Sequence, residues 1–322
     1  MFLRLSALLL LAMMVLAQKP DALAKRIENA PLSAEQRQAI SASLAAKDFA
    51  RIEAILAGIQ PADAGSVKDG LSPAAAAELQ ALLGALDFLG GRMTQAIQAF
   101  ARSDSLRPLN EADRFTLAMA LVSLGDVSDA RAQLSKLDQA HPDQPMYLYW
   151  LARLDYDQRL YEAAVEKLKK VVRLDPTSVR GYDNLGLSYD MMGLTDEAET
   201  AFATAVGLNR KQTQPSPWPP DNQGYLLLRV QKFQAAEESL RESLKYDPKF
   251  ALAHYHLGRV LENLQRDEAA IEEYQSAAEL DSKSTEPLYS LSLLYRRLGR
   301  TAESDSALAE YRRRKALSNP AP

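Results

Sequence analysis

The fold is decided by a stretch near the middle of the chain, residues 179–202, VRGYDNLGLSYDMMGLTDEAETAF. Apolar residues recur in it at helical i, i+3 and i+4 intervals on both sides of a break at Gly193. Gly186 and Ala198 are small enough to let two helix backbones approach closely, and Phe202 fills the space between helices. The stretch therefore predicts two antiparallel amphipathic helices joined by a turn.

The same pattern recurs every 34 residues, with one spacing of 38. In all seven copies the eighth and twentieth residues are small and the twenty-fourth is large, and proline at position thirty-two of four copies stops the second helix. The copies start at residues Ala77, Glu111, Pro145, Val179, Pro217, Ala251 and Thr285. A repeat of this kind predicts a stack of helical hairpins in which each hairpin contacts only its neighbours.

These positions resemble the signature of the tetratricopeptide repeat, most completely in Leu185-Gly186-x-x-Tyr189 and Ala198-x-x-x-Phe202. The resemblance covers residues 77–316 and implies an all-α fold, a right-handed superhelical solenoid of seven antiparallel helix pairs. We expect residues 18–76 to form an N-terminal helical cap and a loop, with a degenerate hairpin over 33–60, because a terminal repeat must present a polar face to water. Residues 317–322 are expected to be a disordered tail.

Two positions depart from the family pattern, and both predict looser or rearranged packing. Gln223 replaces the usual leucine at position seven. The alanine that is usual at position twenty-seven is replaced by Ser103, Leu137, Val171, Ser243 and Tyr311.

Residues 1–17, MFLRLSALLLLAMMVLA, indicate an export signal. Arg4 precedes a twelve-residue apolar run, Leu5 to Leu16, which is shorter than the roughly 20 residues that span a membrane. We expect cleavage after Ala17; an uncleaved anchor or a buried N-terminal helix is the alternative. No second apolar span follows, so we expect no stable membrane insertion after cleavage. The expected location is periplasmic or secreted, and a bacterial source is favoured because the chain has no cysteine for disulfides.

Composition and motifs exclude most chemistry. The chain of 322 residues contains no cysteine and three histidines, so thiol catalysis and cysteine-ligated metals are excluded. Its net charge of −4 disfavours nucleic acid as a partner. Nucleotide-binding, zinc-protease and serine-hydrolase motifs are absent, and His254 and His256 point to different faces of a helix. We therefore expect no enzyme activity, no cofactor and no metal.

The resemblance implies that the first helix of each repeat lines a concave groove with positions two, five, six, nine, twelve and thirteen. In the first two repeats these positions are mostly apolar, for example Phe88, Phe115 and Met119, and we expect them to pack against the cap. From the third repeat they become polar and aromatic, and the candidate ligand contacts are Tyr149, Trp150, Arg153, Asn184, Asn222, Tyr225, Arg229, Tyr255 and Arg259.

Asn184 and Asn222 share position six, where family members often hold a ligand's backbone with the asparagine amide. The equally favoured alternative is that both are solvated consensus residues. Lysine at position five, with which co-chaperone members clamp a terminal carboxylate, is absent, so that function is not transferred.

These observations favour an exported, non-catalytic scaffold that binds a protein or extended peptide in the groove. The alternative is an accessory subunit in envelope polysaccharide or peptidoglycan assembly, with sugars stacked on Tyr149, Trp150 and Tyr225.

Two local features leave alternatives open. Four prolines between Gln214 and Pro220 are expected to prevent helix formation, so that the fifth repeat starts late with Asp221 as its cap. Trp218 then either covers an apolar gap or contacts a ligand. The basic run from Arg312 to Lys315 either complements a helix C-terminus or contacts anionic lipid.

Overall fold

The computed structural model describes residues 20–58 and 72–318, in which all regular secondary structure is α-helical. The expected export signal at 1–17 and the tail residues 319–322 lie outside the described residues, as do 59–71 of the expected loop. The chain divides into two compact units, residues 1–154 and 155–322, which are considered separately below. The boundary falls within the third repeat of the sequence pattern.

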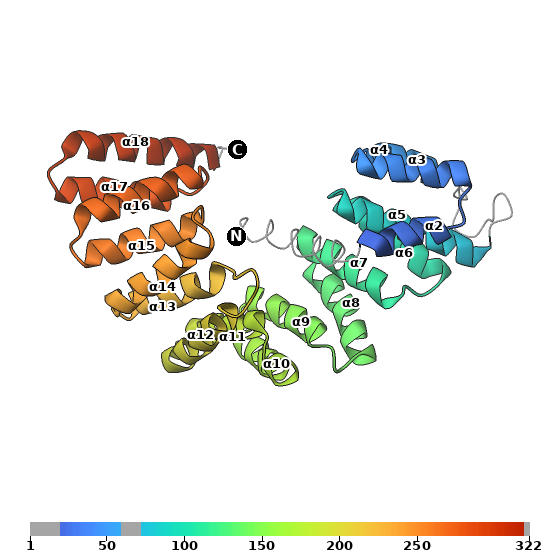
Figure 1. Ribbon diagram of the computed structural model, residues 1–322, viewed down its shortest axis with the longest axis horizontal. Helices are drawn as coiled ribbons and strands as arrows, with labels where there is room; N and C mark the ends of the chain where they lie inside the picture. The colour runs from blue at the N-terminus through green and yellow to red at the C-terminus, as the bar shows by residue number, and fades with distance from the viewer. Residues whose placement is uncertain (1–19, 59–71, 319–322) are drawn as a thin grey trace. The chain divides into compact units, whose positions relative to one another are not determined.

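The first unit contains three helices of the N-terminal region followed by the helices of the first repeats. In Figure 1 the helices α5 and α6, and then α7 and α8, run side by side as antiparallel pairs. Its helices are α2 (Pro20–Asn29), α3 (Ala34–Ala45), α4 (Phe49–Ala57), α5 (Pro73–Leu89), α6 (Met93–Leu106), α7 (Glu111–Leu124), α8 (Val127–Ala140) and α9 (Pro145–Asp157), whose last residues belong to the second unit.

The second unit continues the same arrangement, with the pairs α11–α12, α13–α14, α15–α16 and α17–α18, each packed on the next (Figure 1). Within each unit the helices form an all-α stack of antiparallel pairs, as the sequence predicted. The helices of the second unit are α10 (Tyr161–Leu174), α11 (Val179–Met191), α12 (Thr195–Asn209), α13 (Trp218–Arg229), α14 (Phe233–Tyr246), α15 (Ala251–Asn263), α16 (Asp267–Leu280), α17 (Glu286–Arg297) and α18 (Thr301–Ser318).

Each of the seven repeats turns at the same residue. Position fifteen has a positive φ in every repeat: 73–78° at the four glycines and 59–62° where the residue is not glycine. The left-handed conformation costs a residue with a Cβ roughly 1–2 kcal/mol, and the three repeats that bear this cost do so at Arg159, Gln231 and Gln265. The turn is therefore imposed by the packing of the two helices as well as by glycine.

The close approach of paired helices depends on the small residue at position eight. A Cβ on Gly186 would lie 2.6 Å from the ring of Phe202, and one on Gly258 would lie 2.6 Å from the ring of Tyr274. Ala198, at position twenty, is fully buried. These contacts confirm the role that the sequence predicted for the small and large positions.

The departures from the family pattern rearrange the packing and do not loosen it. Ser103 and Ser243, at position twenty-seven, are buried, and their hydroxyls donate to the carbonyl of the residue at position one of the same repeat, Ala77 O at 2.9 Å and Pro217 O at 2.8 Å. Gln223 accepts a hydrogen bond from Ser239 at 3.1 Å. Polar contacts thus replace the missing apolar ones, so the repeats keep their close packing.

The proline-rich segment is shorter as a linker than the sequence predicted. Helix α13 begins at Trp218, with Pro219 and Pro220 in its first turn, so the prediction that Asp221 caps a late helix is wrong. Proline is tolerated there because first-turn N–H groups have no partner within the helix. Trp218 packs edge-on against Phe250, with ring centroids 4.8 Å apart; both alternatives for this residue stay predictions.

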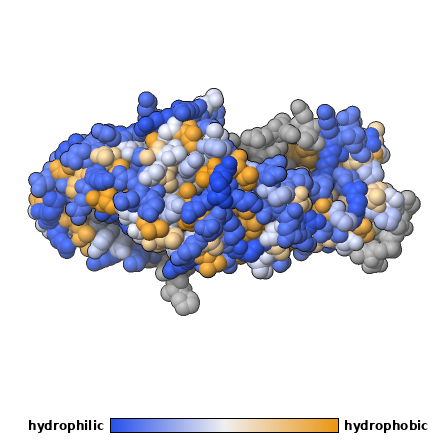
Figure 2. Space-filling view, turned by 90° about the horizontal axis from the view of Figure 1, so that it is seen from below, coloured by the Kyte–Doolittle hydropathy of each residue, from blue (hydrophilic) through white to orange (hydrophobic). Residues whose placement is uncertain are grey.

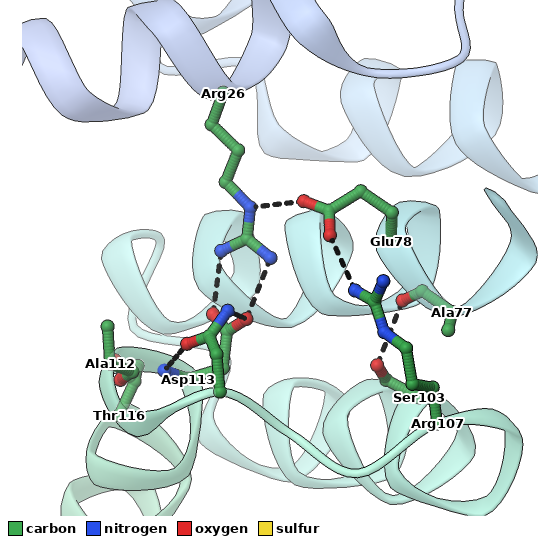
Figure 3. Close-up of polar contacts among 9 residues, drawn as sticks. Arg26, Ala77, Glu78, Ser103, Arg107, Ala112, Asp113 and Thr116 are labelled. Carbon is green, nitrogen blue, oxygen red and sulfur yellow. Dashed lines mark hydrogen bonds and ion pairs between the residues drawn. The ribbon is translucent and has the colours of Figure 1, made fainter. Parts of the chain in front are cut away.

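The N-terminal helices cover the first repeat. Buried side chains of α2, α3 and α4 share one core with α5; its members are Ile27, Ile40, Ile52, Leu56, Leu79, Leu82, Leu83 and Leu86. Helix α2 adds a polar anchor (Figure 3). Arg26 donates to both carboxylate oxygens of the buried Asp113 at 2.6 and 2.8 Å and to Glu78 at 2.9 Å.

The face seen in Figure 2 is mostly hydrophilic, with hydrophobic residues in scattered patches. Across 20–58 and 72–318, no helix is both long enough and apolar enough to cross a bilayer.

Candidate functional site

The candidate surface is built from the first helices of the repeats in the second unit. Helix α11 packs beside α13, and α13 packs beside α15, so equal positions of successive repeats lie in rows. The following contacts join residues of one first helix to residues of the next.

A first row of contacts joins position five of one repeat to position six of the next. The carboxylate of Asp183 accepts from Nδ2 of Asn222 at 3.0 and 3.1 Å. One repeat later, Oδ1 of Asp221 lies 2.9 Å from Nδ1 of His256. Both carboxylates are buried, and burying a charge is costly unless it is paired. The row therefore fixes how one repeat sits on the next.

A second row of contacts joins position twelve of one repeat to position thirteen of the next. Asp190 accepts from Arg229 at 2.6 Å, and Glu262 accepts from Arg297 at 3.4 Å. The step between these two pairs, from the fifth repeat to the sixth, has Leu228 and an asparagine at the corresponding positions. The row of ion pairs is interrupted there.

An aromatic and cationic group, the Tyr225–Arg259 cluster, lies at this interruption. It consists of Tyr225 on α13 and of Tyr255, His256 and Arg259 on α15. The rings of Tyr225 and His256 are stacked with centroids 4.6 Å apart, and the Arg259 guanidinium lies 5.9 Å from the ring centres of both Tyr225 and Tyr255. Contacts of this kind orient the guanidinium without neutralising its charge.

Glu262, one turn beyond Arg259 on α15, is held by other partners. Its Oε2 accepts from the Tyr274 hydroxyl at 2.8 Å, and its Oε1 faces Arg297. Burial, together with the charge of Glu262, raises the pKa of Tyr274 above its usual range, so this phenol stays protonated and donates to Glu262.

The structure brings Asn222, Tyr225, Arg229, Tyr255 and Arg259 of the expected contacts together on α13 and α15. Tyr225, Arg229, Tyr255 and Arg259 form a continuous set, because Arg229 also lies 5.9 Å from the centre of the Tyr225 ring.

The two expected amides are engaged within the protein. Asn184 on α11 is buried, and its Nδ2 donates to the carbonyl of Arg180 at 3.0 Å. The Nδ2 of Asn222 is held by Asp183. The role of both asparagines in ligand binding stays a prediction.

The other three expected contacts, Tyr149, Trp150 and Arg153, lie on α9 in the first unit. Trp150 is only 5% exposed and belongs to that unit's core, and Tyr149 packs edge-on against it at 5.6 Å. In this structure the indole is not open for stacking.

The pairing of Asp221 with His256 was not predicted from the sequence. It could have been found from the repeat alignment, because both buried contacts join position five of one repeat to position six of the next. Within the part of the chain that the structure describes, no group of three or more histidine or acidic side chains could hold a metal ion.

Comparisons with known proteins agree with the repeat pattern. Two family models, both described as tetratricopeptide repeat, match residues 115–179 and 222–285 in one case and 179–212 in the other. No curated protein is a significant match.

Similar solved structures show the fold. A tetratricopeptide repeat protein from Parabacteroides merdae is 16% identical, with 80% of this chain and 93% of that one covered and a TM-score of 0.60. The type IV pilus biogenesis factor PilW is 18% identical, with coverage of 66% and 94% and a TM-score of 0.56. The Cut9–Hcn1 structure of the APC/C is 16% identical, with coverage of 84% and 51% and a TM-score of 0.59.

Proposed function

Because the chain belongs to the tetratricopeptide-repeat family, we propose that it is an exported, non-catalytic scaffold that binds a protein or peptide partner. The observation that carries the proposal is the Tyr225–Arg259 cluster on α13 and α15. Tyrosine and arginine are enriched at the energetic centres of protein interfaces, because they combine apolar area with fixed donors.

Binding of a protein is favoured over stacking on sugars by the state of the aromatic rings. Trp150 is buried, and one face of Tyr225 is covered by His256. A sugar-stacking groove needs open ring faces, whereas a peptide can also use the edges of the rings and the guanidinium groups.

The proposal of export rests on residues 1–17, with Arg4, the apolar run and Ala17. Intact-mass measurement of the protein from its own source tests it. A chain that starts at Gln18 supports export and a periplasmic or secreted location, and a membrane-bound chain that keeps residues 1–17 contradicts it.

The binding proposal is tested by capture from envelope extract, followed by affinity measurement with the protein recovered. A double variant, Arg229→Gln with Arg259→Gln, is expected to lower the affinity at least tenfold, which corresponds to about 1.4 kcal/mol. The matched control changes two exposed arginines on second helices, Arg173→Gln with Arg241→Gln. Equal affinity of both double variants would place the partner elsewhere.

A further inference from the structure

Most charges on the first helices of the second unit are paired; among the arginines there that form no ion pair, Arg180 and Arg296 are exposed, whereas Arg259 is partly buried. Asp183, Asp190, Asp221 and Glu262 each have a partner on a neighbouring element. The two arginines at position thirteen, Arg229 and Arg297, each face a carboxylate.

Arg259 has a different environment. It is partly buried, and rings of Tyr225 and Tyr255 lie beside its guanidinium. No carboxylate among residues 155–318 forms an ion pair with it, since the nearest acid along its helix, Glu262, is held by Tyr274 and Arg297. A guanidinium is a planar set of donors that fits a carboxylate through two parallel hydrogen bonds.

The first unit shows what an arginine does on this scaffold when carboxylates are supplied. Arg26 donates hydrogen bonds to both carboxylate oxygens of Asp113 and to Glu78, and both acids lie on first helices (Figure 3). In the second unit the arginine is on the first helix and the acid is missing. Arg259 therefore offers the donor half of such a pairing.

Apolar side chains lie exposed on the next repeat. Tyr289 and Leu293 on α17 are 47% and 38% exposed. Leu293 shares position nine with Tyr225 and Arg259, and Tyr289 shares position five with Tyr255. Adjacent helices are about 8–10 Å apart, and an extended peptide advances about 3.3 Å per residue, so one repeat corresponds to about three peptide residues.

We propose that Arg259, flanked by Tyr225 and Tyr255, binds an aspartate or glutamate side chain of an extended partner segment whose residue about three positions away is apolar and packs on Tyr289 and Leu293. This inference rests on the proposed function and specifies the chemistry of the partner. It differs from recognition of a chain terminus, because Arg259 would bind the carboxylate of a side chain and not the terminal carboxylate.

The test is selection of a random peptide library, with capped termini, on the full chain and on three variants. Arg259→Gln removes the charge, Arg259→Lys keeps it, and Arg312→Gln is a matched control at an exposed arginine on α18. Circular dichroism checks that each variant keeps the helical content of the parent. Selected peptides are then remade with the acidic residue changed to its amide, and their affinities are measured.

The expected result is enrichment of Asp or Glu with an apolar residue about three positions away, and a loss of affinity of at least tenfold on amidation. Arg259→Gln should abolish this preference, whereas Arg259→Lys should retain part of it and Arg312→Gln all of it. Binding peptides without acidic enrichment, or with enrichment that survives Arg259→Gln, would overturn the inference and leave peptide binding intact. Failure to select any peptide would count against the proposed function itself and against the inference with it.

Discussion

The first unit and the second unit use the same helix pairs but satisfy the charges on their first helices in different ways. In the first unit, Asp113 and Glu78 are neutralised from within the chain by Arg26 of α2. In the second unit, Arg259 has aromatic rings beside it and no acidic partner among that unit's described residues. The residues that repeat at fixed positions therefore determine the stack, while the residues at a few first-helix positions decide whether a surface is covered or open.

The largest effect on stability is expected from removing the guanidinium of Arg26, which pairs with the acids of the first helices. Arg26→Ala leaves the buried Asp113 without its bidentate partner, and breaking a buried pair costs about 3–5 kcal/mol. Because Arg26 is 20% exposed, we expect about 3 kcal/mol. Hydrogen exchange should show that α2 loses protection while α11 to α18 keep theirs.

The matched control for Arg26 is Arg107→Ala, which removes an exposed arginine that also faces Glu78, at 3.2 Å. An exposed pair of this kind is worth less than about 1 kcal/mol. If both substitutions release α2 to the same extent, the pairing with Asp113 is not what holds the helix.

The second test compares how the stability of each unit depends on pH. Burial raises the pKa of Asp87 in α5 from 3.8 to about 6, although the guanidinium of Arg92 opposes the shift. The folded state therefore holds this proton more tightly than the unfolded chain. The stabilisation from Asp87 is complete below about pH 4 and is lost as the pH rises to about 6, with a total of up to about 3 kcal/mol.

The second unit contains a carboxylate with the opposite behaviour. The hydrogen bonds from Arg210 lower the pKa of Glu242 below 4.5, so its stabilisation is present above that pH and is lost in acid. Denaturant unfolding between pH 4 and pH 7, with a separate probe for each unit, should show the first unit weakening as the pH rises. Asp87→Asn should remove that trend, and an unchanged trend in this variant would assign it to another group.

The fold could be predicted because its determinants repeat. Gly186, Ala198 and Phe202 have equivalents at the same positions of the other repeats, so seven copies of the pattern predict the same packing of paired helices. The start of α13 could not be predicted in this way, because the tolerance of proline depends on whether Pro219 and Pro220 fall in the first turn or in the interior of a helix.

The candidate site was predicted less well, for a physical reason. The side chains of Asn222 and His256 are hydrogen-bonded to a carboxylate of the preceding repeat. Periodicity does not reveal which residues face each other across two helices. Trp150 shows the same limit, since its place in the first unit's core follows from its surroundings and not from its position in the repeat.

A third test asks whether each unit responds by itself to damage at the same repeat position. Ala198 in the second unit and Ala130 in the first are both fully buried at position twenty. Changing either to leucine should cost roughly 1–3 kcal/mol through overpacking. Hydrogen exchange should locate the loss in the altered repeat and its neighbours, while distant repeats keep their protection. Loss spread evenly over α5 to α18 would contradict this nearest-neighbour behaviour.

The smallest expected effect concerns the ion pair between Arg229 and Asp190, and it sharpens the contrast with Arg26. Both pairs have a short distance of 2.6 Å, but the side chains of Arg229 and Asp190 are 44% and 11% exposed, whereas those of Arg26 and Asp113 are 20% and 4% exposed. Water and salt screen the exposed pair, so a double-mutant cycle of Arg229→Gln and Asp190→Asn should give a coupling of about 0.2–1 kcal/mol that decreases as salt is raised. The coupling of Arg26 to Asp113, measured by the same cycle, should be larger and less sensitive to salt. If the two couplings prove equal, burial does not distinguish the ion pair that covers the first unit from the exposed ion pair of the second.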